Sequence, residues 1–217
     1  MAKNVTGELL SQNYELQLKF NELFRQINQD NGYPFNFENL MIHLQNGTEG
    51  RFDGNPILQL LSKGESIIID ACDGTETLAN AKNVFKSGID SDFKNWKLDN
   101  AGKITAETAV AVHKIVKDAT FAQMFGSFGT DLEKLCLTQH QIKVFCKKHP
   151  NWLRTEGYAT FFLFKKDDNK PATLDNLFVA YVDVTSDGLC VDVYEFSYGN
   201  VWHAKFAHRV VVPQLAI

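Results

Sequence analysis

Residues 158–165, YATFFLFK, decide the fold class of this chain. Their aromatic and β-branched side chains are typical of a strand. Apolar residues occupy both alternating positions, so Phe161 and Leu163 would face one side of a sheet while Phe162 and Phe164 face the other. A strand with one face in water alternates apolar and polar residues, so we expect this one at the centre of a sheet covered on both faces.

Three more runs of this kind follow along the chain, at residues 177–184, 189–196 and 200–212, the last with a candidate break near Ala207 and His208. The short connectors between them are rich in Asp, Asn, Ser and Gly, which are the residues of tight turns. Because strands this close in sequence pair with their neighbours, the runs predict an antiparallel β-meander.

Helical patterns upstream supply the expected cover for this sheet. Residues 8–30 and 37–44 carry apolar side chains at close to helical spacing. Residues 138–149 open with Thr138 and Gln141, the spacing of a capping box. The expected fold is therefore α+β, with a C-terminal antiparallel β-meander sheet packed against N-terminal and central helices.

The segments between these helices are expected to add strands and one more helix. Residues 57–61 and 66–72 predict two strands joined as a hairpin, and residues 109–116 predict a third strand because of their β-branched content. Asp73 and the glutamate three residues later match a capping pattern, which predicts a helix that continues through Phe85.

Length and composition fit one compact domain over residues 1–217. The chain has 217 residues, of which 44% are hydrophobic, enough to bury a core without a disulfide or a metal. Its five prolines are isolated and no linker of low complexity interrupts it. The alternative organisation is a helix-rich lobe at 1–150 and a β-rich lobe at 151–217.

The charge balance argues against a polyanionic partner. Lys and Arg number 22 and Asp and Glu number 26, which gives a net charge of −4 spread along the chain. Binding of nucleic acid backbones or anionic lipid requires a dense positive face, so neither partner is expected. No apolar run has the length of a signal or a membrane span.

The four cysteines, Cys72, Cys136, Cys146 and Cys190, lie scattered in apolar surroundings. Their spacing matches no short metal-binding motif, which indicates reduced and buried thiols. We therefore expect a protein of the reducing cytoplasm.

Four stretches carry a family resemblance: Asp73–Thr77, Leu135–Gln139, Trp152–Phe162 and Val210–Gln214. They resemble pieces of a family of uncharacterised proteins of similar length from candidate-phylum bacteria. The resemblance covers most of the chain after residue 60. It implies a bacterial, intracellular protein and carries over no functional residue.

Residues 67–75 run from three isoleucines into aspartates and a Gly-Thr turn. This pattern is similar to the first motif of haloacid dehalogenase-type phosphotransferases, which implies Asp70 as nucleophile and a Mg²⁺ ion on the phosphate. That family separates its two carboxylates by one residue, whereas two residues separate Asp70 from Asp73, and these positions point to opposite sides of an extended chain. The interpretation we adopt is that Asp73 caps a helix and Asp70 ends a strand.

A set of Cys136, His140, Cys146 and His149 resembles a zinc-binding composition. Structural zinc requires two close pairs from separate elements. Three of these residues fall on one predicted helix, with His140 and Cys146 about 120° apart around its axis. We therefore expect no metal site here, and no cofactor is predicted for the chain.

Aromatic and basic residues gather near the C-terminus, one hairpin away from a lysine pair. On a sheet surface such a group is typical of sites for single-stranded nucleic acid. The alternative is that alternate residues from Trp202 point inward while His203 and Lys205 face water. The residues are Trp202, His203, Lys205, His208 and Arg209, with Lys165 and Lys166 nearby.

These observations favour a non-enzymatic cytoplasmic protein that acts as an interaction or small-ligand-binding module, with a homodimer through one sheet face as its expected assembly. The competing hypothesis is a Mg²⁺-dependent phosphohydrolase that uses Asp70. The third is a weak single-stranded nucleic-acid binder that uses Trp202, Lys205 and Arg209.

Overall fold

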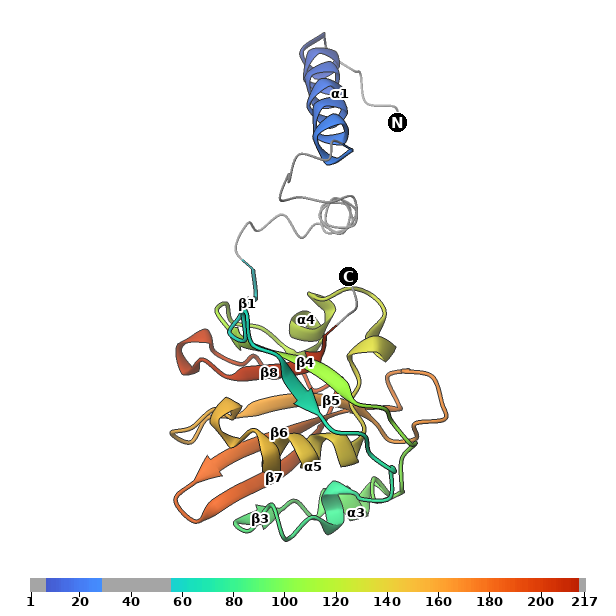
Figure 1. The fold of residues 1–217 in the computed structure, drawn as a ribbon. Helices are drawn as coiled ribbons and strands as arrows, with labels where there is room; N and C mark the ends of the chain where they lie inside the picture. Colours follow the sequence, from blue (N-terminus) through green and yellow to red (C-terminus); the bar gives the residue numbers. More distant parts are fainter. Residues whose placement is uncertain (1–6, 29–55, 215–217) are drawn as a thin grey trace. The chain divides into compact units, whose positions relative to one another are not determined.

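The computed structural model describes residues 7–28 and 56–214 (Figure 1). The chain divides into two compact units, Met1–Gly54 and Asn55–Ile217. In the first unit, helix α1 spans Gly7–Ile27, as the periodicity of residues 8–30 predicts. The helix predicted at residues 37–44 lies outside the described residues.

A mixed sheet of eight strands forms the body of the second unit (Figure 1). Seven strands lie in the order β1-β4-β8-β5-β6-β7-β3, and β2 pairs with β4. The strands are β1 (Leu58–Leu60), β2 (Ile67–Ile69), β3 (Gly88–Ile89), β4 (Thr108–Ile115), β5 (Thr160–Lys165), β6 (Leu177–Thr185), β7 (Gly188–Glu195) and β8 (Arg209–Pro213).

The predicted meander is correct for three strands and wrong for the fourth. β5, β6 and β7 pair antiparallel in sequence order. β8 instead lies on the other side of β5 and runs parallel to it, while β3 runs parallel to β7. The reason is a break in the run 200–212, where the 3₁₀ helix η4 (Ala204–Phe206) and the left-handed Ala207, with a φ of 49°, carry the chain across to the far side of β5.

The predicted hairpin between residues 57–61 and 66–72 does not form. β1 and β2 both pair with β4, one behind the other along the same edge. Between them, the Ser62 hydroxyl accepts a hydrogen bond from the Val112 N–H at 3.0 Å, and the Leu61 N–H donates to the Val112 carbonyl at 2.8 Å. These two strands therefore act as one interrupted edge strand beside β4, which is itself the strand predicted at 109–116.

Helix α5 (Gln139–Lys148) covers one face of the sheet (Figure 1). Its predicted capping box is present, because the Thr138 hydroxyl accepts from the Gln141 N–H and the Gln141 side chain accepts from the Thr138 N–H. The ring of Phe145 meets the ring of Phe162 edge-on, with centroids 5.3 Å apart. The central helix thus packs against the sheet as expected.

The opposite face is covered by two short helices on either side of residues 127–131. Helix α4 (Phe121–Gly126) and the 3₁₀ helix η2 (Leu132–Leu135) lie in the same hydrophobic cluster as this face. The ring of Phe121 meets that of Phe161 edge-on at 5.1 Å. The expected N-terminal cover belongs to the other unit, so within Asn55–Ile217 this face is closed by local helices.

The central position of β5 is confirmed. Phe161, Phe162, Leu163 and Phe164 are all 0% exposed, so both of its faces are buried. Strands from both sides of residue 150 share this sheet, since β4 pairs with β8. A lobe boundary at that residue would therefore cut through the sheet.

The predicted helix from Asp73 to Phe85 is wrong in its first turn. The Asp73 carboxylate accepts from the Thr75 N–H at 2.9 Å and from the Thr75 hydroxyl at 2.7 Å, so it closes a turn on its own chain. The Gly74 carbonyl accepts from the Gly102 N–H at 2.8 Å, which holds this segment against residues 102–105. The helical structure that follows begins at η1 (Leu78–Asn80). In the described part of Asn55–Ile217, the other short helices are α3 (Asp92–Asn95) and the 3₁₀ helix η3 (Pro150–Trp152).

We predict that Gly74→Ala destabilises the protein more than Gly157→Ala does. Both glycines have positive φ, 79° and 75°, but a Cβ on Gly74 would lie 2.5 Å from the Gly102 carbonyl oxygen, whereas a Cβ on Gly157 meets nothing within 4 Å. The backbone strain common to both is about 1 kcal/mol, and the clash adds ~2 kcal/mol. Urea denaturation measures both losses, and equal losses would show that the close approach at Gly74 has no energetic weight.

We predict that buried His208 makes the fold acid-sensitive. It is 4% exposed, and its Nδ1 accepts from the Ala159 N–H at 3.1 Å, so the neutral ring is built into the core. Burial lowers the pKa of His208 from 6.5 to about 4. The neutral ring therefore contributes its full stability above pH 6.5, and this contribution is lost progressively as the pH falls towards 4. The loss in the free energy of unfolding is on the order of 3 kcal/mol.

The test is the free energy of unfolding measured from pH 7.5 to pH 4 for the parent and for His208→Gln. Glutamine keeps an acceptor for Ala159 and does not titrate, so the variant should show a shallower decline. A decline as steep as that of the parent would assign the acid sensitivity to other groups.

Candidate functional site

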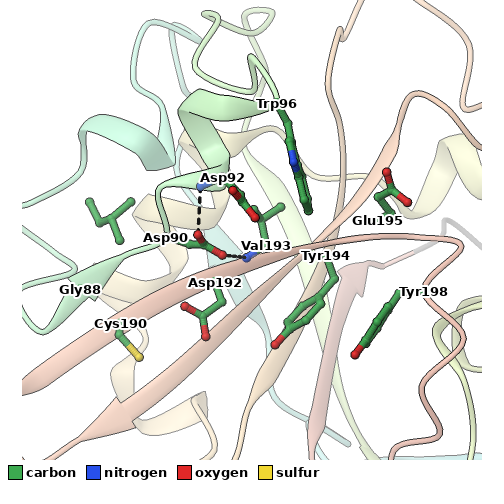
Figure 2. A pocket seen from close by; sticks show the side chains of 11 residues that line it. Gly88, Asp90, Asp92, Trp96, Cys190, Asp192, Val193, Tyr194, Glu195 and Tyr198 are labelled. Atoms are coloured by element: carbon green, nitrogen blue, oxygen red, sulfur yellow. Dashed lines mark hydrogen bonds between the residues drawn. The ribbon is translucent and has the colours of Figure 1, made fainter.

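A groove of about 780 Å³ lies at the sheet edge, where β3 ends beside β7 (Figure 2). We call it the β7 edge groove. Its lining comes from β3, from α3 (Asp92–Asn95) with the residues next to it, and from β7 with the turn that follows. It contains four carboxylates and three aromatic rings, and among the described residues no Lys, Arg or His lines it: Gly88, Ile89, Asp90, Asp92, Trp96, Cys190, Asp192, Val193, Tyr194, Glu195 and Tyr198.

The pleat of β7 distributes these side chains over both faces of the strand. Asp192 and Tyr194 stand opposite Tyr181 and Val179 of β6, which places them on one face. Glu195 follows on the other face. Figure 2 shows Asp192 and Tyr194 on one side of β7, with Glu195 on the opposite side. The groove therefore wraps around a strand edge and is not a closed cavity in the core.

Asp90 fixes the chain at the end of β3. One oxygen of its carboxylate accepts from the Asp92 N–H at 2.9 Å, and the other accepts from the Val193 N–H at 3.5 Å (Figure 2). The first bond closes the turn into α3, and the second ties this turn to β7. Asp90 therefore fixes the backbone on two sides of the groove and also contributes a negative charge to it.

The electrostatic setting of Asp192 disfavours its own ionisation. Burial raises the pKa of this carboxyl, and the nearby negative charges of Asp90 and Asp183 raise it further. Burial also raises the pKa of the Tyr194 hydroxyl, with Asp192 as the next contributor. A cation in the groove would act against both effects, because an opposite charge nearby favours the ionised carboxylate.

The aromatic rings give the groove apolar walls. Tyr194 and Tyr198 stack with their ring centroids 5.1 Å apart, and Tyr198 is 47% exposed. Trp96 is anchored by Phe178, with centroids at 6.0 Å. A ring face next to a carboxylate is the arrangement that attracts ammonium and guanidinium groups.

The sequence analysis named Cys190 as a buried thiol, and singled out no carboxylate or aromatic residue of this groove. Its strand at 189–196 was identified correctly, and the polar residues Asp192 and Glu195 within it were a usable local signal of solvent contact. The approach of Asp90 and Trp96 depends on the pairing of Ile89 with Val191. Such a long-range pairing leaves no mark in a local pattern.

The two aspartates proposed for phosphoryl transfer have different partners. The Asp70 carboxylate forms an ion pair with Lys148 at 2.5 Å. Asp73 accepts from Thr75 and contacts His140 at 3.2 Å. In residues 7–28 and 56–214, no group of three or more His, Cys, Asp or Glu is placed to hold a metal ion. The geometry therefore lacks the support that a Mg²⁺-dependent reaction would draw from a carboxylate cluster.

The Cys and His set is dispersed around α5. Cys136 donates to the Leu132 carbonyl, and burial raises its pKa to about 12. Burial also raises the pKa of Cys146. The His149 ring contacts the Ile68 carbonyl oxygen at 2.8 Å, away from these thiols. Each of these three side chains is therefore buried or hydrogen-bonded within the fold.

The C-terminal residues are engaged within the fold. Trp202 packs against Phe161 with centroids 4.9 Å apart. His203 contacts the Asp118 carboxylate at 2.8 Å. Arg209 donates to the carbonyls of Asn151 and Leu153, at 3.2 and 3.1 Å, and His208 is the core residue described above.

A stack of rings and cations lies beside Arg209. Tyr158 and Phe206 stack at 4.8 Å, Arg154 lies 5.2 Å over the Tyr158 ring, and Lys205 lies 4.7 Å over the Phe206 ring. The two rings are therefore covered by each other and by cations of the same chain. This stack leaves little ring surface for a nucleic-acid base.

The lysine pair, Lys165 and Lys166, is also engaged within the fold through its first member. Lys165 has a side chain that is 3% exposed, and its ammonium group pairs with Glu133. It also donates to the carbonyls of Asp168 and Lys170, at 3.0 and 2.8 Å. Its charge is therefore satisfied inside the protein, and Lys166 follows it at the end of β5.

No protein-family model, curated protein or solved structure matches the chain. Membership of a protein family from candidate-phylum bacteria, which the sequence resemblance implies, therefore stays a prediction. Across residues 7–28 and 56–214, no helix combines the length and apolar character that crossing a bilayer requires.

We predict that Asp70→Asn leaves hydrolysis of an aryl phosphate with Mg²⁺ unchanged and lowers stability by about 1 kcal/mol or less. The ion pair with Lys148 is mostly exposed, with side chains 59% and 44% accessible, and such pairs contribute little. A phosphatase assay and urea denaturation check both values. Parent activity that disappears in Asp70→Asn would restore the phosphohydrolase hypothesis.

Proposed function

We propose that this protein is a non-enzymatic binding module whose β7 edge groove takes ligands that carry an organic cation, such as an alkylammonium or guanidinium group. The observation that carries the proposal is the groove's composition. Four carboxylates and three rings line one concavity without a basic residue among the described ones. Its volume of about 780 Å³ suits a small ligand or a short segment of chain.

The energetics favour a cation with an apolar stem. Asp192 is partly buried among other carboxylates, so an incoming positive charge gains from several of them at once. The stacked rings of Tyr194 and Tyr198 add cation–π attraction of roughly 0.5–2 kcal/mol and contact with methylene groups. A compact metal ion would use only the carboxylates, whereas an organic cation uses both.

The groups in the groove favour binding over catalysis. Burial raises the pKa of the Cys190 thiol and of the Tyr194 hydroxyl. Both groups are therefore held in their protonated, weakly nucleophilic form. This supports the non-enzymatic function expected from the sequence.

The expected setting is the cytoplasm of a bacterium, and the expected assembly is a homodimer, which the sequence analysis placed at a sheet face. The described central strands carry buried side chains on both faces, as β5 does. A self-association surface is therefore sought near the margins of the sheet. Light scattering across a concentration series measures the assembly directly.

We predict that 1,5-diaminopentane binds the protein and that 1,5-pentanediol, its neutral analogue, does not. Asp192→Asn and Tyr198→Leu should each weaken the diamine about tenfold, because one removes a central charge and the other an exposed ring. Binding should also weaken as the pH falls and Asp192, whose pKa is raised, takes up a proton. Isothermal titration calorimetry measures each affinity.

The matched control is Asp187→Asn, which removes one exposed carboxylate from the β6–β7 turn, outside the groove lining. It should leave the affinity within twofold of the parent value, as expected for one screened charge. Equal weakening in Asp187→Asn and Asp192→Asn would reduce the effect to net charge and overturn the site. Equal binding of diamine and diol would overturn the cation preference.

A further inference from the structure

The edge of β7 is open along part of its length. Its parallel pairing with β3 covers Cys190 and Val191. The Asp90 N–H makes the next backbone bond on this side, to the Val191 carbonyl at 2.9 Å. Beyond that bond, no strand of the described chain pairs with this edge.

The backbone groups of the open part point into the groove. The Phe196 N–H donates to the Leu177 carbonyl of β6 at 3.1 Å, which fixes the alternation of bonds along β7. The backbone groups of Asp192 and Tyr194 therefore face β6, as the pairing of Tyr194 with Val179 requires. The carbonyl of Val193 and the N–H of Glu195 therefore face the opposite way, towards the side on which Asp90 binds Val191 and Val193.

β3 ends just before Asp90, where a side-chain hydrogen bond replaces the next backbone hydrogen bond to β7. In a parallel pair, one residue donates its N–H to the strand beside it and returns its carbonyl to an N–H two residues further on. Asp90 makes the first bond with its backbone, to Val191. Its carboxylate, and not its carbonyl, accepts from the Val193 N–H at 3.5 Å. The next pair of groups on this line, the Val193 carbonyl and the Glu195 N–H, fits one residue of another parallel segment.

The side chains beside this edge specify what that segment carries. Consecutive residues of an extended chain point to opposite faces. On one face lie Asp192 and the Tyr194–Tyr198 stack, and on the other lie Glu195 and Trp96 (Figure 2). Two adjacent basic residues would each meet a carboxylate and an aromatic ring.

We infer that the β7 edge groove binds an extended segment of another protein, parallel to β7, in which two consecutive residues are Lys or Arg. The segment continues the line of β3 and adds backbone hydrogen bonds to the cation contacts. This inference rests on the proposed cation binding and names the partner class of the same site.

The experiment titrates the full chain with three peptides by isothermal titration calorimetry. The probe is Ac-Val-Lys-Arg-Val-NH₂. The second peptide has N-methyl groups on the two central residues, so it keeps both charges but loses the backbone N–H donors of those two residues. The third, Ac-Val-Gln-Gln-Val-NH₂, keeps the backbone and loses the charges. We expect the probe to bind and each altered peptide to bind at least about tenfold more weakly.

Two protein variants separate the backbone from the charge. Glu195→Gln removes a carboxylate and keeps the N–H, whereas Glu195→Pro also removes the N–H, on an edge where proline is tolerated. We expect Glu195→Pro to bind the probe more weakly than Glu195→Gln does, with both binding 1,5-diaminopentane equally well. If Glu195→Pro does not fold, the N-methylated peptide carries the same test on the parent protein.

The outcomes distinguish the two proposals. Equal binding of the probe and the N-methylated peptide, with the diamine still bound, overturns strand addition and leaves cation binding intact. Absence of binding for both diamine and probe overturns cation binding and the inference with it. Probe binding that depends on the backbone N–H groups supports both.

Discussion

The burial of β5 on both faces is the constraint on which the rest of this structure depends. Phe161 and Leu163 need cover on one side of the sheet, and Phe162 and Phe164 need it on the other. A single helix layer meets half of this requirement. The unit Asn55–Ile217 therefore folds as three layers, with α5 on one face and α4 with η2 on the other.

This demand for cover also explains where the groove lies. The helices cover the central strands, so the polar side chains of the sheet lie near its margin, along β7. β3 has two residues and protects only the start of that edge. The carboxylates and rings that follow are consequently half-buried or exposed, where a ligand can reach them. A margin that would otherwise invite aggregation is thus charged, which is a common protection of exposed strand edges.

Local patterns predicted the parts of the fold that local energetics govern. The doubly apolar run identified β5, and Thr138 with Gln141 marked the start of α5, because side-chain burial and capping act within a few residues. Asp73 shows the limit of this reasoning. Its carboxylate closes a turn with Thr75 instead of capping a helix, because Gly74 is hydrogen-bonded to the distant Gly102. The parallel placement of β8 and the groove both depend on contacts between distant segments. The spacing of residues within one segment carries no information on such contacts, so neither the placement of β8 nor the groove was predicted from the sequence.

The place of β8 also constrains biosynthesis. This strand comes last among the eight, yet it lies between β4 and β5 and joins the two halves of the sheet. Without residues 209–213, the pairings divide into two separate groups, with β1, β2 and β4 in one and β5, β6, β7 and β3 in the other. Completion of the fold must therefore follow translation of this strand, and until then the emerging chain presents surfaces that chaperones bind.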